Sequence, residues 1–484
     1  MPRRSPPNAL ARETLATWIR EGGPRALLAI AVAGLVASSS ACSLYHRAPL
    51  PPLSSLASGR PLEPASLQAR IDEIDHPILK SQAVVLSDGI GPMEAALLAV
   101  VLNPDLAAAR ARRGEARAGV IAAGILPNPV FGGGLDRPYG TGSAGLADVV
   151  SLSLSIDSQR ILTRWARLAV ARGELEQVDL DVAWQEWQVA QAARLEAVRL
   201  AWLERRVALA REQLAQEEET TARLGHAYDA RDATVERLGV QLAARETVRA
   251  NVMGLEEART RSRSALLALW GQPAVSDLRM EPPGPAEVSA PVPETARVAP
   301  LCLERRIDLV ALRRGHAAQD ARVRQAVIEQ LPDVSIGIAH QRDESSLRFF
   351  GGFVSLSVPV FDRNQATVAL AVATRERLAL EYEARVASVR STLDETLGIL
   401  RMLQHRLPEV ASAVGPLARL ERSERAAAET GDVSWLSYAT LRVALLEQRL
   451  QEAALSQLAA ETRIGIDTAC GTLDWQPPAP EERG

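Results

Sequence analysis

The residues that could carry chemistry in this sequence are few and scattered. Three cysteines and six histidines occur among 484 residues, and no two cysteines have the C-x-x-C spacing of a redox pair or a zinc site. The sequence contains no G-x-S-x-G, H-E-x-x-H or glycine-rich phosphate loop, the patterns that build nucleophilic, metalloprotease or nucleotide sites. The histidines never fall at ligand spacing: His46, His76, His226, His316, His340 and His405. We therefore expect a protein that is not an enzyme and that has no metal site and no cofactor.

Cys42 has a context that predicts a modification. Several arginines precede an apolar run of 12 residues, 26–37, which leads into the small residues S-S-S-A. This order is typical of an export signal, and the run is shorter than the ~20 residues of a membrane-spanning helix. The residues before Cys42 resemble the end of a bacterial lipobox, so we expect acylation of Cys42, with Ser43 favouring an outer-membrane address. The alternative is plain cleavage near Ala41, because Ser39 stands where a lipobox usually carries leucine.

Charge and composition exclude some partners and favour one fold class. The 55 basic and 59 acidic residues give a net charge of −4, and Lys80 is the only lysine. No basic surplus is available to neutralise phosphates, so nucleic acid is not an expected partner. Aromatic residues make up 4% of the chain, while alanine, arginine, leucine and glutamate are abundant. This composition favours long surface helices over a sandwich of many strands.

The main part of the chain consists of two similar sequence repeats. Four landmarks recur in the same order at nearly constant spacing, which is the mark of an internal duplication. The pairs are Asp105-Leu106 and Asp308-Leu309, Leu126-Pro127 and Leu331-Pro332, Val150–Leu154 and Val354–Val358, and Asp232–Thr234 and Asp432–Ser434. We predict a signal peptide at 1–41, a tether and collar segment at 42–90, a first repeat at 91–274, a Pro-rich linker at 275–300, a second repeat at 301–470 and a tail at 471–484.

Each repeat is predicted to run helix, two strands, long helix, return helix. The first helices should end at the Leu-Pro pairs, because the residue before proline is driven out of the helical region. Pro408 and Pro416 should kink or break the second long helix. Asp232 or Thr234, and Asp432 or Ser434, can cap the return helices. The predicted helices are Pro92–Gly124, Ile161–Leu224 and Thr234–Leu269 in the first repeat, and Leu301–Gln330, Asn364–Glu429 and Ser434–Ile466 in the second.

Two serine-rich segments alternate strictly between small polar and aliphatic residues. They are Ser151–Ile156, with Ser151, Leu152, Ser153 and Leu154, and Val354–Val360, with Ser355, Leu356 and Ser357. The pattern fits a barrel wall between water and lipid, although a soluble half-buried hairpin has the same pattern. Four strands per chain cannot close a barrel, and an open sheet edge in lipid would expose unpaired amides. Three chains supply twelve strands, so membrane insertion implies a homotrimer.

With these motifs the sequence resembles the TolC-like outer membrane factors, the exit ducts of tripartite efflux pumps and type I secretion systems. The likeness covers roughly 92–471 and rests on the duplication and on four short motifs. These are N-P-D-L at Asn103–Leu106, I-D-L at Ile307–Leu309, S-V-P-V-F-D at Ser357–Asp362 and G-D-V-S at Gly431–Ser434. The sequences of Ile121–Val130 and Pro359–Gln365 are most similar to those of the CzcC-like branch, which serves heavy-metal pumps.

The resemblance implies a mainly α fold with a small β part. Long helical hairpins would form a trimeric periplasmic tunnel, and four strands per chain would contribute to a shared twelve-stranded outer-membrane barrel. The chain would be a passive duct, lipid-anchored and working with a periplasmic adaptor, an inner-membrane pump of the RND type and outer-membrane lipid. Divalent heavy-metal cations are the expected cargo. The alternative cargo is drugs or the substrates of type I secretion. A periplasmic adaptor and a structural coiled-coil lipoprotein are the less favoured classes of protein.

The resemblance also assigns two sites. Cys302 and Cys470 would lie near the equatorial collar in an oxidising compartment, where we expect a disulfide. The periplasmic mouth would be formed by Gly225, Asp232, Gly431, Asp432, Ser437 and Thr440. Drug-exporting members carry two acidic residues where this chain has Ser437 and Thr440. We therefore expect a mouth closed by packing and interhelical hydrogen bonds, with Trp435 and Tyr438 as plugs and with weak block by multivalent cations.

Overall fold

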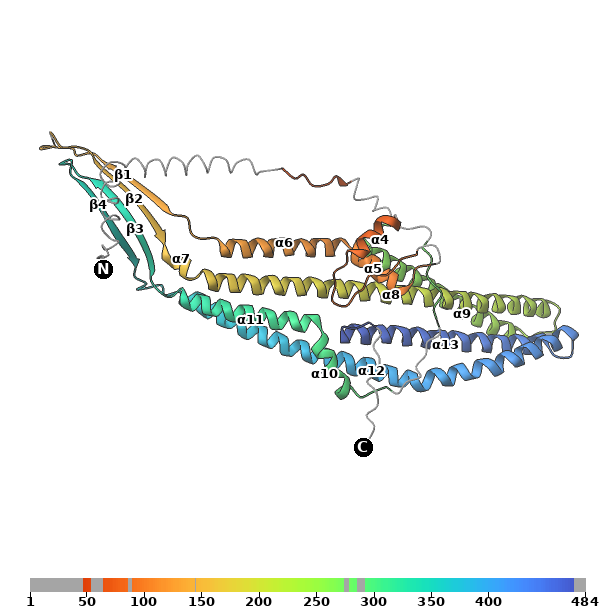
Figure 1. Ribbon diagram of the computed structural model, residues 1–484. Helices are drawn as coiled ribbons and strands as arrows, with labels where there is room; N and C mark the ends of the chain where they lie inside the picture. Colours follow the sequence, from red (N-terminus) through yellow and green to blue (C-terminus); the bar gives the residue numbers. More distant parts are fainter. Residues whose placement is uncertain are drawn as a thin grey trace, which may run out of the picture. The chain divides into compact units, whose positions relative to one another are not determined.

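The computed structural model describes residues 47–53, 64–85, 89–143, 145–273, 278–284 and 292–473. The predicted export signal and Cys42 lie outside these residues. The chain divides into two compact units: unit 1 holds the described parts of 1–52, 120–170 and 319–373, and unit 2 holds the described parts of 53–119, 171–318 and 374–484. The expectation of a mainly helical chain with four strands is confirmed (Figure 1).

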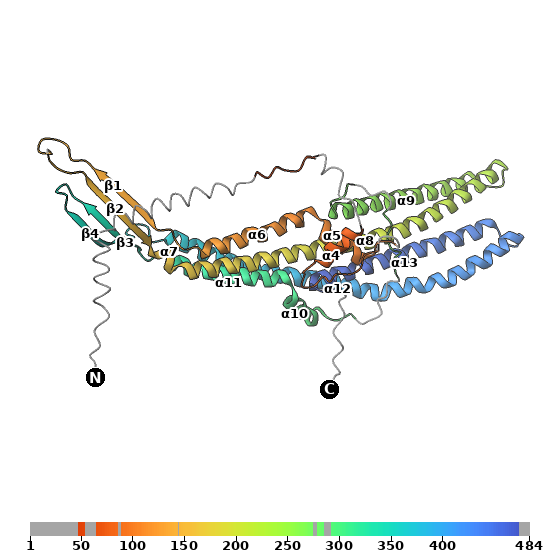
Figure 2. The same ribbon diagram turned by 45° about the horizontal axis from the view of Figure 1, so that its top comes forward.

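Unit 1 is built around one antiparallel sheet in the order β1-β2-β3-β4. The strands are β1 (Val130–Asp136), β2 (Val149–Asp157), β3 (Asp333–Arg342) and β4 (Arg348–Ser357). The short helix α7 (Ser158–Leu162) follows β2 directly in the chain. We call the end of the sheet that carries both hairpin connections the turn end, and the opposite end the helix end. β2 pairs with β3 across the two repeats, with Leu154 opposite Ile338. The duplicated halves thus form one continuous sheet (Figure 2).

The register gives the sheet two different faces. Side chains alternate along each strand, so Leu154 shares a face with its partners Phe131 and Ile338, and Ser153 shares the other face with Gly132 and Ala339. A Cβ atom on Gly132 would lie 2.7 Å from the Ser153 hydroxyl, which explains the glycine. β4 ends at Ser357, three residues before the predicted end at Val360, because Pro359 has no N–H to donate to a strand.

Unit 2 contains most of two long helical hairpins. The first pairs α8 (Arg164–Asp229) with α9 (Val235–Leu269), and the second pairs α12 (Gln365–Thr430) with α13 (Trp435–Cys470). In both views the two helices of each hairpin lie side by side (Figures 1 and 2). Of the two alternatives predicted for α12, a kink or a break, the break is wrong, because both Pro408 and Pro416 lie inside one helix of 66 residues. The packing of buried side chains such as Leu403 and Leu407 keeps the chain helical through the prolines.

The predicted first helix of each repeat is two helices. The first repeat has α5 (Pro92–Leu102) and α6 (Pro104–Gly124), bent by 52°. Asn103 breaks the run because Pro104 follows it and because its side chain makes two hydrogen bonds, donating to the Leu269 carbonyl and accepting from the Leu106 amide. No single described helix is long and apolar enough to cross a membrane, and the α5–α6 pair passes that test by length and composition only.

The second repeat breaks at Arg306, between α10 (Thr295–Arg305) and α11 (Ile307–Ile328). The Arg306 guanidinium makes a buried ion pair with Asp308 at 2.7 Å and donates to the Ala469 carbonyl at 2.8 Å. α10 begins inside the segment predicted as a linker and contains Pro300. Its buried face, which includes Val298 and Cys302, packs into one apolar cluster with α12 and α13, and this packing outweighs the hydrogen bond lost at proline.

A segment before the first repeat covers the middle of α8. It begins with α4 (Pro64–Asp72), whose Leu67 and Ile71 pack on α5. The chain then continues to Leu79, which is buried against Trp184 and Trp187 of α8 and against Ile307 of the second repeat. Apolar burial by this short segment therefore joins the two repeats within unit 2.

Candidate functional site: the hairpin turns and the contacts behind them

The two hairpin turns of unit 2 have the same local structure. Thr234 caps α9 by accepting a hydrogen bond from the Arg237 amide at 3.3 Å, and Ser434 caps α13 by accepting from the Ser437 amide at 3.1 Å. Gly431 has φ +86°, in the left-handed region that glycine adopts without strain. The capping role expected for Asp432 is wrong, because its carboxylate accepts from the Thr430 hydroxyl at 2.6 Å.

The other residues predicted for the mouth lie around these turns. Asp232 and Asp432 are exposed, and each amide donates back to a carbonyl five residues earlier, at Ala227 and Ala427. Gly225 lies half-buried in the last turns of α8. Ser437 and Thr440 are exposed, and their hydroxyls are bonded locally: Ser437 to the Ser434 hydroxyl at 3.0 Å, and Thr440 to the Leu436 carbonyl at 2.9 Å. Neither hydroxyl bridges two helices.

The aromatic residues after the second turn make contacts within the chain. The Arg223 guanidinium of α8 lies 3.7 Å from the centroid of the Trp435 ring, a cation–π distance. Trp435 and Tyr438 have ring centroids 4.9 Å apart. Tyr438 is only 4% exposed, so its ring is part of the helix packing and is not a free plug. The pair therefore fastens α13 to α8 near the turns.

Arg442 connects three helices one turn further along α13. Its guanidinium donates to the Tyr438 hydroxyl at 3.1 Å, to Glu421 of α12 at 3.1 Å and to Glu212 of α8 at 3.0 Å. Glu421 is 8% exposed, so it is a carboxylate that needs this partner. Charge-assisted hydrogen bonds from one guanidinium to two carboxylates are strong and geometrically selective. We call Arg442, Glu421 and Glu212 the arginine clamp.

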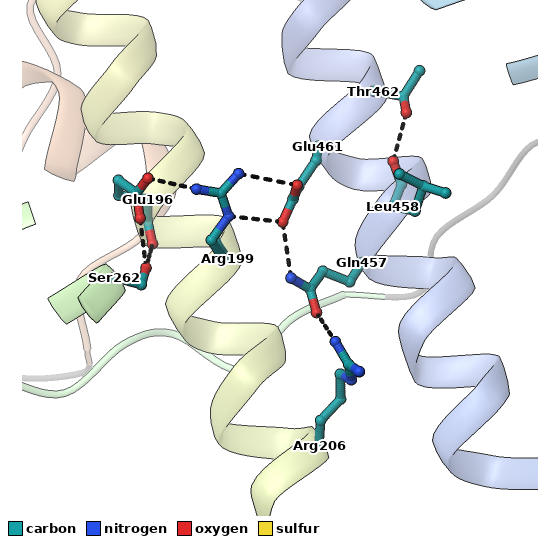
Figure 3. A network of polar contacts seen from close by, with 8 residues as sticks. All are labelled: Glu196, Arg199, Arg206, Ser262, Gln457, Leu458, Glu461 and Thr462. Atoms are coloured by element: carbon teal, nitrogen blue, oxygen red, sulfur yellow. Dashed lines mark hydrogen bonds and ion pairs between the residues drawn. The ribbon is translucent and has the colours of Figure 1, made fainter. Parts of the chain in front are cut away.

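A second polar network ties the hairpins together further from the turns (Figure 3). Arg199 of α8 makes two hydrogen bonds to Glu461 of α13, at 3.1 and 3.2 Å, and one to Glu196 at 2.6 Å. Ser262 of α9 donates to Glu196 at 2.7 Å, and Gln457 joins Glu461 to Arg206. In Figure 3, Arg199 and Arg206 of α8 meet Glu461 and Gln457 of α13, while Glu196 meets Ser262 on the other side of α8. The network fixes the register of the two hairpins.

The base of each return helix is fastened to the first helix of its own repeat. In the second repeat, Cys302 of α10 and Cys470 at the end of α13 form a disulfide, with their Cα atoms 4.1 Å apart. In the first repeat, the Trp270 indole at the end of α9 donates to the Ala95 carbonyl of α5 at 3.1 Å. One repeat thus has a covalent fastening where the other has a hydrogen bond and a buried ring.

Removing the disulfide should lower the stability of the second repeat. We expect Cys302→Ser to reduce the free energy of unfolding by about 2–4 kcal/mol, because the cross-link closes a long loop of the unfolded chain. Chemical denaturation of the purified protein with and without reductant measures this. The reductant should destabilise the parent chain and leave the variant unchanged. Mass analysis without reduction that finds both cysteines alkylated would contradict the prediction.

His76 holds the segment before the first repeat onto α8. Its Nε2 lies 2.8 Å from the Ala183 carbonyl, and its Nδ1 accepts two hydrogen bonds, from the amides of Ile78 and Leu79, each at 3.0 Å. This pattern requires the neutral ring, because a protonated Nδ1 cannot accept. Burial lowers the pKa of His76 below its usual 6.5. The Ala183 carbonyl and Glu186 oppose that shift, and Arg113 and Arg110 add to it.

Acid should weaken this attachment. Because the folded pKa of His76 lies below that of the unfolded chain, the unfolded chain binds the proton more readily. The stabilisation is therefore complete above pH 6.5 and is lost as the pH falls below that value. We expect hydrogen exchange of the amides of Ile78 and Leu79 to accelerate between about pH 7 and pH 5, after correction for the intrinsic rate. His76→Gln should remove this change, and substitution of the exposed His405 should not.

Sequence reasoning missed Arg442, Glu421, Glu212 and His76. The carboxylates and the guanidinium of the clamp are far apart in the chain, and nothing in their local pattern distinguishes them from other surface charges. The one usable signal was their place just behind the two duplicated turns. Within the described ranges, no group of three or more histidine, cysteine, aspartate or glutamate side chains is placed to hold a metal ion.

The fold defined by this sheet and these hairpins is that of known outer-membrane channels. Similar solved structures include CusC, with 16% identity and a TM-score of 0.61 over 83% of this chain and 99% of that one. The channel OprN has 17% identity and a TM-score of 0.64 over 88% and 98%. VceC from Vibrio cholerae has 17% identity and a TM-score of 0.61 over 79% and 96%. No family model and no curated protein sequence matches the chain.

Proposed function

We propose that this chain is the outer-membrane duct of a tripartite efflux system and that it works as a homotrimer. The observation that carries the proposal is the sheet of unit 1. One face is apolar over most of its length, and the other is rich in serine, glycine and alanine and also carries Phe349 and Phe353 of β4. The two edge strands, β1 and β4, have no further strand beside them among the described residues. Such a sheet is stable in lipid only if its edges are paired. The likeness of fold to outer-membrane channels over most of the chain supports the same reading.

Three copies would pair β1 of one chain with β4 of the next and close twelve strands. The apolar face would then contact lipid, and the small polar face would line a water-filled pore. The helix end of the sheet leads into the long hairpins, so we place it on the periplasmic side and the turn end at the outer surface. The residues around Gly431 would form the periplasmic mouth, and the arginine clamp would help to hold it closed.

The trimer can be tested directly. The full mature chain, extracted in detergent and measured by light scattering with correction for the detergent, should have the mass of three chains. Cell fractionation should place it in the outer membrane. A monodisperse monomer, or a cytosolic protein, would contradict the proposal.

We further propose that the cargo is a divalent heavy-metal cation delivered by an RND-type pump through a periplasmic adaptor. The support is the resemblance of Ile121–Val130 and Pro359–Gln365 to the CzcC-like branch. Deleting the gene should sensitise the cells to zinc, cadmium or cobalt salts, and the intact gene should restore resistance. Sensitisation to drugs alone would assign the duct to a drug pump. Acylation of Cys42 stays a proposal, and Cys42→Ala should abolish the incorporation of labelled palmitate.

A further inference from the structure

The apolar face of the sheet ends in a cluster of basic side chains at its turn end. The face is apolar from Ile336 and Ile338 of β3 to Val354 and Leu356 of β4. By the alternation of side chains, the same face continues into His340, Arg342 and Arg348. We call these three residues the basic rim. Arg342 is exposed, and Arg348 is its direct partner across the β3–β4 pair.

This arrangement costs free energy unless an anion is present. Like charges directly opposite on neighbouring strands are destabilising, and Arg342 and Arg348 are Cα partners. Arg342 donates to the Ser346 hydroxyl at 3.0 Å, a neutral partner. In the part of the chain that the structure describes, neither guanidinium has a carboxylate within ion-pair distance.

Two of the nearby acidic residues have other partners. Asp148, whose field reaches Arg342, is held by Arg137, with both nitrogen to oxygen distances at 3.1 Å. The Asp343 carboxylate accepts from the Leu347 amide at 2.8 Å within the turn. A bound anion would therefore meet two guanidinium groups that make no ion pair within the described part of the chain.

We propose that the basic rim binds the phosphate of a phosphorylated glycolipid headgroup in the outer leaflet. This inference rests on the proposed function, which places the apolar face in lipid and the turn end at the outer surface. Guanidinium groups bind phosphate through paired hydrogen bonds. The position of the rim at the border of the apolar face favours a lipid over free phosphate, because the acyl chains can lie against Ile338, Val354 and Phe350 while the headgroup meets the arginines.

Binding of lipid A to the detergent-solubilised trimer tests the proposal. We expect saturable binding of the phosphorylated lipid and much weaker binding of the same lipid after enzymatic removal of its phosphates. Arg342→Gln combined with Arg348→Gln should weaken binding about ten- to hundredfold, the range expected for lost hydrogen bonds to a charged group. The matched control combines Arg137→Gln with Asp148→Asn, which removes the ion pair at the same end of the sheet without releasing a carboxylate beside Arg342 and without changing the net charge.

Each outcome decides the matter. Equal affinity of the double variant and the parent chain, or equal loss in the control, would overturn the proposal. Full competition by inorganic phosphate at the concentration of the lipid would also overturn it, because the site would then be a free anion site. If the double variant does not fold, the comparison of the two lipids on the parent chain decides alone. A parent chain that is not an outer-membrane trimer would refute the proposed function, whereas a trimer with no phosphate preference refutes only this inference.

Discussion

Replacing Arg442 with alanine should open the proposed channel. The substitution removes the guanidinium that joins α13 to Glu421 of α12 and to Glu212 of α8. Glu421 would remain buried without its partner, and its carboxylate would repel that of Glu212. This repulsion would push α8 and α12 apart. We expect the conductance of single channels in planar bilayers to rise several-fold, with longer open times. Cells that carry the variant should become sensitive to large antibiotics that the outer membrane normally excludes.

A matched variant separates the clamp from a general loss of charge. Arg425 of α12 makes an exposed pair with Glu429, one helical turn apart and close to the same hairpin turn. Exposed pairs of this kind contribute little to stability, so Arg425→Ala should leave the conductance unchanged. Arg442→Lys should keep the mouth closed only in part compared with the parent chain. One ammonium group cannot reproduce the contacts of the guanidinium with both Glu421 and Glu212. Closed channels with Arg442→Ala would show that other contacts govern the mouth.

Replacing Leu154 with arginine should abolish assembly in the membrane. Leu154 lies between Phe131 and Ile338 on the apolar face. An arginine facing lipid near the middle of a barrel costs about 2–4 kcal/mol, and the proposed homotrimer would carry the substitution in every copy. We expect the amount of detergent-stable trimer in the outer-membrane fraction to fall to a small part of that of the parent chain, as measured by native electrophoresis and immunoblotting.

Ser153→Arg is the control for this prediction. Ser153 is the neighbour of Leu154 in β2, and its side chain shares the opposite face with Gly132 and Ala339. In the proposed barrel that face meets water, so the arginine should be accommodated and should change mainly the ion selectivity of the pore. Equal loss of trimer in both variants would contradict the assignment of the two faces.

The architecture was largely predictable because it depends on repeating local signals. The alternation of serine and leucine predicted β2 and β4, and the internal duplication predicted the two hairpins. The capping of α9 by Thr234 and of α13 by Ser434 follows from local hydrogen bonding that such residues favour at a helix start. The strands and caps depend on residues that lie within one or two turns of each other, and the duplication is visible because the same short motifs return in the second half of the sequence.

The errors have a common physical cause. Proline normally ends a helix, yet Pro300, Pro408 and Pro416 all lie inside helices. Burial against distant segments compensates for the lost hydrogen bond, and sequence spacing does not reveal that burial. The same holds for Arg306, which breaks a predicted helix in order to reach Asp308 and the Ala469 carbonyl. The arginine clamp could not be predicted either, since Arg442 and Glu212 are 230 residues apart.

The unequal fastening of the two repeats has a mechanical consequence for the proposed ring. Three copies would place six hairpins around one axis, alternating between the α8–α9 type and the α12–α13 type. Only the second type is held at its base by a covalent bond, between Cys302 and Cys470, while the first relies on the Trp270 hydrogen bond. Stiffer and more compliant hairpins would therefore alternate around the tunnel. A load applied by a docked partner would deform the three α8–α9 hairpins more than the three α12–α13 hairpins. The ring would therefore deform with threefold rather than sixfold symmetry.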